Sequence, residues 1–494
     1  MLDQSRCIGC HACTTACKSE NEVPLGVTRT YVKSVDVGLF PQARRAFQVT
    51  RCNQCEDAPC VAACPTAAMY RRPDGIVDFD KSACIGCKAC IAACPYDAIF
   101  INPDDHSAEK CNFCSHRIDA GLEPACVVVC PTQAIFVGDL NDPTSRATQV
   151  VNRQPVQVRR PEKDTQPKVF YLGATQMTLD PLAARRPEGG LFMWAEQGSV
   201  SRQVTSGHPG SANSSAAAVL SYDVPHLVPW DWRVSLYTWT KGIAAGVYLV
   251  ALALVLVGVL RADGRLWMLA TPVIAGALLA ATGAVLIWDL EHRLRFVYIF
   301  TRPQWRSWLV RGAVFISGYG LVLAAHFLLG LLGTSAPARW LGLAGAPLAA
   351  ATAVYTGYLF AQAKARDLWQ SPLLPPHLLV QAALAGVSAL LPAAAWLEPR
   401  AVPELLVLLT AAAATHLLMV LGEATLGHPT AHARLAAHEM HRGRFARFFW
   451  LGMAAVALSA LAPVIGPVAA LPALAGLLLH EHAYVQAGQS VPLA

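Results

Sequence analysis

The residues with the clearest capacity for chemistry are sixteen cysteines, all of which lie between Cys7 and Cys130. They fall into four groups of four, and none is left over. The members are Cys7, Cys10, Cys13 and Cys17; Cys52, Cys55, Cys60 and Cys64; Cys84, Cys87, Cys90 and Cys94; and Cys111, Cys114, Cys126 and Cys130. Cysteine thiolates are soft ligands, so this grouping predicts sites for a thiolate-bound metal.

The spacing within the groups decides between two kinds of metal site. The first and third groups follow the C-x2-C-x2-C-x3-C pattern that is typical of bacterial ferredoxins. A proline follows the last cysteine of the second, third and fourth groups. Taken alone, the fourth group, in "EKCNFCSHRIDAGLEPACVVVCP", has the paired cysteines of a zinc finger. Because the pattern recurs along the chain, we expect four [4Fe–4S] clusters rather than four zinc knots.

These ligands must be positioned by tight loops, each followed by a helix. A cubane needs four thiolates at its iron corners, and three closely spaced cysteines can wrap three of them. The helix then carries the fourth cysteine to the neighbouring cluster. "GIVDFDKSACIGCKAC" and "DAIFINP" predict short strands beside the loops, which favours an α+β ferredoxin-like fold. Four basic residues beside the ligands are expected either to raise the cluster potentials or to be solvated surface charges: Arg6, Lys88, Lys110 and Arg117.

The stretch from Arg6 to about Gly138 resembles the four-cluster ferredoxin subunits (NrfC-, PsrB- and DmsB-like) of molybdopterin oxidoreductases and of some hydrogenases. In that family the first and fourth motifs interleave in one ferredoxin module, and the second and third interleave in another. The resemblance therefore implies four ligand sets: Cys7, Cys10, Cys13 with Cys130; Cys17 with Cys111, Cys114 and Cys126; Cys52, Cys55, Cys60 with Cys94; and Cys64 with Cys84, Cys87 and Cys90.

The chain changes character near residue 230. Residues 1–230 carry 22 basic and 23 acidic side chains, whereas residues 231–494 carry only 17 and 10 and consist largely of Ala, Leu, Val and Gly. Eight apolar stretches, each close to the ~20 residues that a bilayer requires, predict membrane spans: 234–260, 266–289, 308–333, 340–362, 376–397, 402–425, 446–463 and 465–486. Since the excess positive charge lies in this half, we expect contact with the lipid bilayer and no nucleic-acid binding.

We therefore expect three regions. They are a tandem ferredoxin-like α+β domain (1–140), a connecting segment (141–229) and an all-α bundle of eight transmembrane helices (230–494). In the connecting segment, "NRQPVQVRRPEKDTQPKVFYLG" resembles the extended tail with which such ferredoxin subunits clasp their catalytic partner, although a plain linker is the alternative. "SGHPGSANSSAAAV" has the composition of a flexible tether.

The distribution of positive charge predicts an orientation. Eight spans place both chain ends on one side, where the loops carry eleven Lys and Arg residues, against four in the opposite loops. The positive-inside rule then predicts a multi-pass protein of the inner (cytoplasmic) membrane with its iron–sulfur domain facing the cytoplasm. The opening "MLDQSRCIGC" has no apolar segment of a secretory signal, which fits a reducing compartment. Export together with a partner that carries its own signal is the alternative.

The membrane half resembles the polysulfide-reductase-type, NrfD-like quinone-reactive subunits, on the stretches "WRVSLYTWTKGIAAGVYL" and "WDLEHRLRFVYIF". The resemblance implies menaquinone or ubiquinone as electron acceptor or donor, and no haem, although a bis-histidine pair within the spans is the alternative. Six residues near one end of the first two spans are candidates for the quinone site: Tyr237, Trp239, Lys241, Asp289, His292 and Arg295. Further ionisable residues in the spans predict either proton relays or interhelical polar contacts: His326, His416, Glu423, His480, Glu481 and His482.

The sequence contains no flavin, dinucleotide or nickel motif and no domain large enough for molybdopterin, so we expect no substrate catalysis by this chain alone. The main hypothesis is an electron-transfer and membrane-anchor subunit. It would connect a separate catalytic subunit, most simply a molybdopterin enzyme that oxidises sulfite or formate, to membrane quinone. Reduction of polysulfide, tetrathionate or dimethyl sulfoxide stays open. The alternatives are a proton-translocating module of a larger quinol-oxidising complex and an electron-transfer subunit of a hydrogenase.

Overall fold

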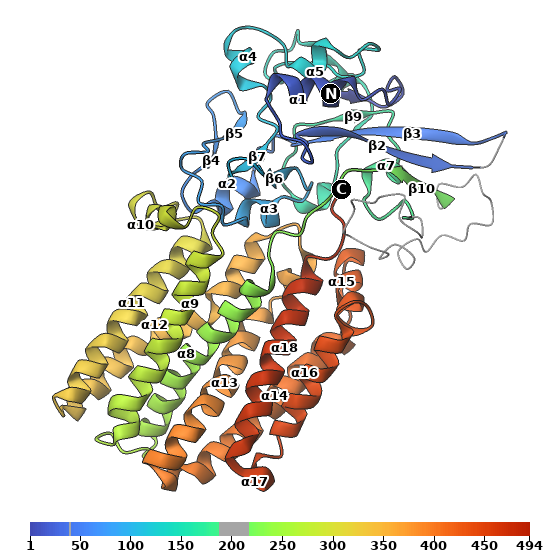
Figure 1. Ribbon diagram of the computed structural model, residues 1–494. Helices are drawn as coiled ribbons and strands as arrows, with labels where there is room; N and C mark the ends of the chain where they lie inside the picture. Colours follow the sequence, from blue (N-terminus) through green and yellow to red (C-terminus); the bar gives the residue numbers. More distant parts are fainter. Residues whose placement is uncertain (39–40, 187–216) are drawn as a thin grey trace. The chain divides into compact units, whose positions relative to one another are not determined.

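The computed structural model describes residues 1–38, 41–186 and 217–494. The chain divides into two compact units. The first contains Met1–Pro229, Ala363–Ala365 and Ser490–Ala494, and the second contains Trp230–Gln362 and Arg366–Gln489. Figure 1 shows short strands and helices in the first unit and long helices in the second. The expected order, an α+β domain followed by an all-α membrane domain, is confirmed.

The elements of the first unit are short because the cysteine loops interrupt them. Its helices are α1 (Ala12–Glu20), α2 (Pro59–Ala63), α3 (Ala89–Ala93), α4 (Ser115–Asp119), α5 (Ala125–Val128), α6 (Arg146–Arg153) and α7 (Gln176–Leu179). Its strands are β1 (Leu2–Asp3), β2 (Thr30–Val37), β3 (Arg44–Arg51), β4 (Met69–Arg71), β5 (Val77–Phe79), β6 (Ile99–Ile101), β7 (Ala108–Lys110), β8 (Val156–Gln157), β9 (Tyr171–Leu172) and β10 (Val219–Tyr222). Strands β5 and β6 lie where the sequence predicts them.

The strands form four small sheets. β2 and β3 pair antiparallel over eight residues, from Thr30 opposite Arg51 to Val37 opposite Arg44, and β10 adds to the other edge of β2. The second sheet has the order β1-β9-β8, in which β1 and β9 run parallel. The hairpins β4-β5 and β6-β7 complete the set. Small sheets of this kind cannot supply a large aliphatic core, and cysteines make up much of the core instead.

The connecting segment joins these sheets in its described parts. β9 and β10 come from residues 141–229, and each pairs with a strand from the first 40 residues. Tyr171 of β9 is fully buried and donates a hydrogen bond from its hydroxyl to the carbonyl of Val49 at 3.1 Å. The connecting segment is therefore held by strand pairing in both of its described parts. Most of the tether "SGHPGSANSSAAAV" lies outside the described residues.

An ion cluster fixes the end of the connecting segment. The imidazole of His226 lies 2.5 Å from the Asp97 carboxylate through Nδ1 and 3.0 Å from Asp223 through Nε2. Burial disfavours the charged ring, but the two carboxylates outweigh it and raise the pKa of His226 to about 10. The ring is thus positively charged at neutral pH. Because Asp97 follows Cys94 closely, this cluster ties the end of the segment to a cysteine loop.

The second unit contains the long apolar helices. They are α8 (Trp232–Leu256), α9 (Thr271–Trp288), α11 (Trp308–Leu331), α12 (Ser335–Gln362), α13 (Leu374–Leu397), α14 (Val402–Thr425) and α18 (Ala470–Gly488). A π-helical turn, η4 (Leu266–Ala270), leads into α9, and the shorter helices are α10 (Tyr298–Thr301), α15 (Ala431–His441), α16 (Ala446–Ser459) and α17 (Ala462–Ile465). Within the described residues, seven helical segments are long and apolar enough to cross a membrane.

The eighth apolar helix is shorter than the sequence predicts. The expected span 446–463 corresponds to α16, which has 14 residues, and to the separate turn α17. At 1.5 Å per residue α16 is about 21 Å long, against about 30 Å of hydrocarbon. It packs closely on α18, where the α-carbon of Gly452 faces the backbone of Gly476. The apolar stretches of the sequence predict the correct number of apolar helices, but they overestimate the length of α16.

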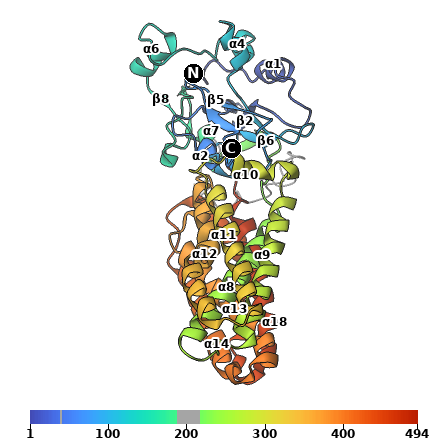
Figure 2. The same cartoon turned by 90° about the vertical axis from the view of Figure 1, so that its left-hand side faces the viewer.

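Helix α8 is the centre of the second unit. It packs against α9, α12, α13 and α18, and these helices surround it in both views (Figures 1 and 2). The contact with α13 is made by backbone: a Cβ atom at Gly246 would lie 1.7 Å from the carbonyl oxygen of Ala382, and one at Gly386 would lie 2.1 Å from the backbone of Gly246. Small residues permit such close packing of membrane helices, where dispersion contacts drive association.

This contact gives a first prediction. Gly246→Ala must push α8 and α13 apart, and we expect a loss of about 1–3 kcal/mol in unfolding free energy, the cost typical of overpacking. Thermal unfolding of the detergent-purified protein measures it. The control is Gly242→Ala on the same helix, because a Cβ at Gly242 meets nothing within 4 Å. Equal melting temperatures for the two variants would show that the close contact is unimportant.

Candidate functional site

The four cysteine motifs adopt the same backbone turn. In each C-x-x-C sequence the residue before the second cysteine has a positive φ; these residues are Gly9 (69°), Gln54 (47°), Gly86 (72°) and Phe113 (63°). After each of the three Cys-Pro pairs a second left-handed residue follows: Ala67, Asp97 and Gln133. Turns of this type direct successive backbone N–H groups toward one point and create a site for an anion. The internal repeat read from the sequence is therefore also a structural repeat.

One cysteine-lined pocket joins the two ends of the cysteine-rich region. Cys17 from α1 lines it together with Cys111, Cys114 and Cys126, which lie nearly a hundred residues further along. Side-chain nitrogens surround these sulfurs: Arg51 Nη1 donates to Cys126 Sγ at 3.2 Å, and Asn21 Nδ2 donates to Cys114 Sγ at 3.6 Å. The four cysteines are the set expected for one cluster.

A second pocket is lined by Cys64, Cys84, Cys87 and Cys90, which is again one expected set. Here the donors are backbone groups. The amide of Met69 donates to Cys64 Sγ and that of Ala108 to Cys84 Sγ, both at 3.4 Å. N–H···S hydrogen bonds stabilise the negative charge on thiolate and sulfide, and they are one means by which a protein sets a cluster potential.

Seven of the remaining eight cysteines belong to one of two buried cores or pack against it. Cys52, Cys55, Cys60 and Cys94 belong to one buried core, while Cys7, Cys13 and Cys130 pack around another and Cys10 is exposed. All sixteen thiols are free of disulfides. Burial raises the pKa of Cys13 to about 11 and that of Cys94 to about 12. Thiols of this kind stay protonated at neutral pH until a metal displaces the proton.

Arg51 supplies an independent test of whether a negatively charged cluster fits. Its side chain is buried, and Nε and Nη2 have no hydrogen-bond partner among the described residues. Leaving donors of a buried guanidinium unsatisfied is costly unless an acceptor occupies the space they face. The sulfides of a [4Fe–4S] cluster held by the neighbouring thiols would provide that acceptor. The donor set therefore fits an iron–sulfur cluster.

Two of the four basic residues named from the sequence differ clearly in their surroundings. Lys110 is fully buried, and its ammonium donates to the backbone carbonyls of Val77 and Cys111. Arg117 pairs with Glu20 at 3.1 Å and donates to the carbonyl of Glu123, so its charge is largely neutralised near the surface. Of these two, Lys110 is thus the one placed to act on a cluster through a low-dielectric interior.

In the second unit, Lys241 is the most enclosed of the expected quinone-site residues. It is fully buried on α8, and its Nζ donates to the carbonyl of Ala353 at 2.8 Å and to Thr356 Oγ1 at 2.7 Å. The Tyr355 ring centroid lies 4.6 Å away, within cation–π distance. A single turn of α12 thus holds the ammonium. Tyr237 is buried one helical turn before Lys241 on the same face of α8.

The other candidates have separate neighbours. Trp239 donates from Nε1 to the carbonyl of Leu474 on α18 at 2.9 Å. Asp289 follows the last turn of α9 and lies 3.3 Å from the guanidinium of Arg233. His292 and Arg295 are half-buried at the short helix η5 (Arg293–Val297). The assignment of these residues to quinone stays a prediction.

Some ionisable residues of the spans prove to be interhelical contacts. His326 on α11 is fully buried, and its Nδ1 lies 3.0 Å from the hydroxyl of Tyr248 on α8. The Trp267 ring packs against the same imidazole. The interhelical interpretation therefore accounts for His326. His482 packs its ring on Phe448.

Sequence reasoning missed three groups. Arg51 directly precedes Cys52, but its contact is with Cys126, and no local pattern predicts that direction. Thr356 and Tyr355 lack charge and so carried no signal as neighbours of Lys241. His377 lies inside the expected span 376–397, and a complete search of that span for ionisable residues finds it.

Comparison with known families agrees with both halves of this geometry. Residues 43–140 match the family described as a 4Fe-4S dicluster domain, and residues 223–476, just over half of the chain, match the family described as polysulphide reductase, NrfD. The first match includes three of the four cysteine motifs. An iron–sulfur domain and a multi-pass membrane domain therefore share one polypeptide.

Three curated relatives each match between 34% and 39% of the chain. The B subunit of tetrathionate reductase from Salmonella typhimurium is 44% identical over 193 residues, which are 37% of this chain and 76% of the relative. The B polypeptide of polysulfide reductase from Wolinella succinogenes is 44% identical over 34% of this chain and 91% of its own length. A putative iron-sulfur subunit of dimethyl sulfoxide reductase from Halobacterium salinarum is 38% identical over 39% of this chain and 84% of its own length. Each is similar to the iron–sulfur part.

With the cysteine pockets, the apolar helices and these matches in agreement, the chain therefore belongs to the polysulphide reductase NrfD family, with an iron–sulfur domain of the 4Fe-4S dicluster type preceding its membrane module.

Proposed function

We propose that this chain passes electrons through four [4Fe–4S] clusters between a separate catalytic subunit and a membrane quinone, and anchors that subunit to the bilayer. The observation that carries the proposal is the presence of sixteen free thiols, eight of which line two buried pockets in sets of four, in a chain that also forms a membrane bundle. One cluster is sufficient for sensing, whereas a series of clusters suits transport. Bound clusters supply one-electron transfer.

The proposed ligand sets are those of the interleaved pattern. Cys17, Cys111, Cys114 and Cys126 hold one cluster and Cys64, Cys84, Cys87 and Cys90 hold another, which is supported by the two pockets that these residues line. The other two sets are Cys7, Cys10, Cys13 with Cys130, and Cys52, Cys55, Cys60 with Cys94. The last cysteine of each motif lies within or just after a short helix, so these helices determine the separation between neighbouring clusters.

The partner is proposed from the chemistry that this chain lacks. Relatives are named as subunits of tetrathionate, polysulfide, dimethyl sulfoxide, arsenate and selenate reductases. This supports a separate catalytic subunit, which is proposed to be a molybdopterin enzyme. Oxidation of sulfite or formate is the proposed reaction, and in that case electrons would flow toward quinone.

The quinone site is proposed at the end of α8 that carries Tyr237 and Lys241. Reduction of a quinone requires hydrogen-bond donors for its carbonyl oxygens and a supply of two protons. The Lys241 ammonium is a donor held by Thr356 in an apolar interior, where its interaction with a carbonyl is strong. Asp289 and His292 are proposed to carry protons at the boundary. The eleven basic loop residues support placement of this end at the cytoplasmic face of the inner membrane.

The cluster count is tested by chemical analysis. We expect about sixteen iron and sixteen acid-labile sulfide per chain in anaerobically purified protein, since each cubane contains four of each. Cys17→Ser removes one ligand and should lower both values by about four. About four iron and four sulfide in the unaltered protein would contradict the four-cluster proposal.

Arg51 gives a prediction about potential. Arg51→Gln removes a buried positive charge and a donor to Cys126, so the potential of the cluster at Cys17, Cys111, Cys114 and Cys126 should fall by tens of millivolts. A redox titration followed by electron paramagnetic resonance measures the shift. Arg45→Gln on the same strand is the control, because Arg45 is exposed and pairs with Asp36. An unchanged cluster potential in Arg51→Gln would show that Arg51 does not influence this cluster.

Lys241 gives a prediction about quinone. After reduction with dithionite, the clusters of Lys241→Ala should be re-oxidised by a short-chain quinone analogue at least about tenfold more slowly, which corresponds to the loss of one charged hydrogen bond. Re-oxidation by ferricyanide should keep its rate. Gly242→Ala, at the next position of α8, controls for the fold. A Lys241→Ala protein that reacts with quinone at the normal rate would place the site elsewhere.

A further inference from the structure

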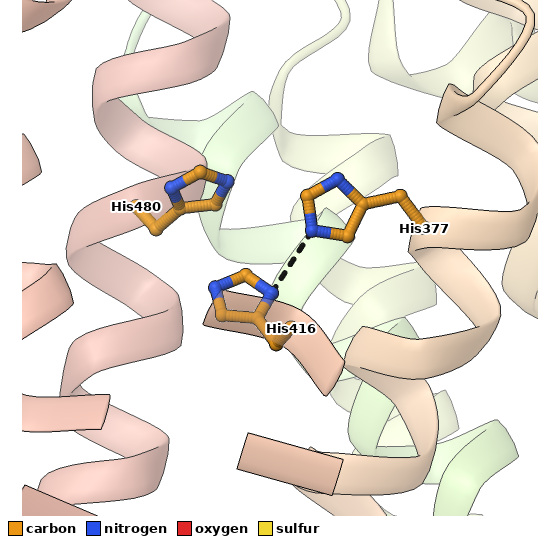
Figure 3. Close-up of side chains that lie close together, drawn as sticks. All are labelled: His377, His416 and His480. Atoms are coloured by element: carbon orange, nitrogen blue, oxygen red, sulfur yellow. Dashed lines mark hydrogen bonds between the residues drawn. The ribbon is translucent and has the colours of Figure 1, made fainter. Parts of the chain in front are cut away.

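Three histidines from three different helices meet inside the membrane bundle. His377 belongs to α13, His416 to α14 and His480 to α18, and all three side chains are between 0% and 2% exposed. One ligand atom of each lies within 4.8 Å of those of the other two. Figure 3 shows the three rings turned toward a common centre. These residues are called the histidine cluster below.

The hydrogen bonds within the histidine cluster leave part of it unsatisfied. His377 Nε2 and His416 Nδ1 lie 2.9 Å apart and share one proton between them. His416 Nε2 and His480 Nδ1 have no hydrogen-bond partner among the described residues. A buried polar group without a partner is costly, and this cluster contains two of them. Membrane interiors offer little water to satisfy such groups.

A carboxylate lies behind the cluster. Glu423 Oε1 is 3.4 Å from His377 Nδ1, the ring nitrogen that faces away from His416. Metal-bound histidines commonly donate their second N–H to a carboxylate, which fixes the tautomer and makes the ring a stronger ligand. Glu423 is half-buried, whereas Glu481, next to His480 in the chain, is buried and interacts electrostatically with His377. Two carboxylates are thus available to balance the charge of a divalent cation.

We propose that the histidine cluster binds one divalent transition-metal ion of the zinc class through His377, His416 and His480, with Glu423 as a positioning residue behind His377. Three imidazoles are a ligand set that Zn²⁺ adopts, whereas Mg²⁺ and Ca²⁺ take oxygen ligands. The ion would connect the three helices α13, α14 and α18. It would also keep a fourth coordination position for water or a carboxylate.

The present spacing suits this ion and not a haem. Metal–nitrogen bonds of about 2.0–2.1 Å in a tetrahedral site place two ligand nitrogens about 3.4 Å apart. His377 Nε2 and His416 Nδ1 lie 2.9 Å apart and need only a small rotation of the rings to reach that value. His480 Nδ1, which has no hydrogen-bond partner among the described residues, would be the third ligand atom, and His416 Nε2 would stay outside the coordination. Axial ligands of a haem lie on opposite sides of the iron with the porphyrin between them, and two hydrogen-bonded rings leave no room for it.

The test uses the full chain, purified in detergent with its clusters intact, treated with a chelator and dialysed against Zn²⁺. We expect about one zinc per chain in addition to the iron. Zinc K-edge X-ray absorption should give nitrogen or oxygen neighbours near about 2.0 Å, which distinguishes this site from zinc bound to vacant cysteines, where sulfur lies at about 2.3 Å. No zinc, or zinc with sulfur neighbours alone, would overturn the proposal.

Variants assign the ion to these residues. His416→Gln and His480→Gln should each weaken zinc binding by more than about a hundredfold, and Glu423→Gln by about ten- to a hundredfold with the nitrogen shell retained. His326→Gln is the matched control, since His326 is equally buried but paired with Tyr248, and it should keep its zinc. Thermal unfolding of each detergent-purified variant reports whether its membrane bundle has folded, and two histidine variants guard against the failure of one. Unchanged zinc binding in both histidine variants would overturn the assignment. Proton transfer through the histidine cluster without any bound zinc would overturn it too.

Discussion

Ligation of iron by buried thiolates is the constraint on which the iron–sulfur unit depends. Four sulfurs must meet at one cubane, and the chain satisfies this by bringing Cys17 to Cys111, Cys114 and Cys126 across nearly a hundred residues. The helices between the ligands are consequently only four to nine residues long in α1, α2, α3 and α5, and the sheets have two or three strands. Buried cysteines occupy positions that aliphatic side chains fill in other small domains. Binding of the metal is therefore part of folding.

The burial of the thiolates also explains why the described parts of the connecting segment fold onto the iron–sulfur unit. β9 pairs with β1 beside the first motif, and His226 is fixed by Asp97 beside the third. Val169 and Tyr171 of the segment also pack in the same core as Cys13 and Cys126. Limited access of water to a cluster is one of the factors that set its potential. The segment is thus part of the environment of the clusters.

The membrane unit is organised by close helix contacts. Gly246 and Gly386 let α8 and α13 touch by backbone, and Gly452 and Gly476 do the same for α16 and α18. With the helices so close, a polar side chain on one finds a partner on another: Lys241 on Thr356, His326 on Tyr248, and His377 on His416. The apolar stretches specify that helices form, and the glycines specify how near they come.

The sequence predicts the parts that depend on local pattern. The cysteine motifs indicate iron–sulfur ligation because their spacing is set by the cluster, and the apolar stretches indicate spans because their length is set by the bilayer. Local sequence patterns do not specify which residues far apart in the chain will come into contact. The contact of Arg51 with Cys126 and the meeting of His377 with His480 depend on tertiary packing, as does the shortness of α16. No local sequence pattern predicted these two contacts or the length of α16.

The proposed electron transfer requires that the four proposed cubanes lie close enough together to exchange electrons. Spin quantification by electron paramagnetic resonance of the fully reduced chain tests this most directly. We expect a total near about four spins per chain, since each reduced [4Fe–4S] cluster carries one unpaired spin, with signals broadened by magnetic interaction between neighbours. A total near one, or four narrow signals without any interaction, would contradict the proposed series of clusters.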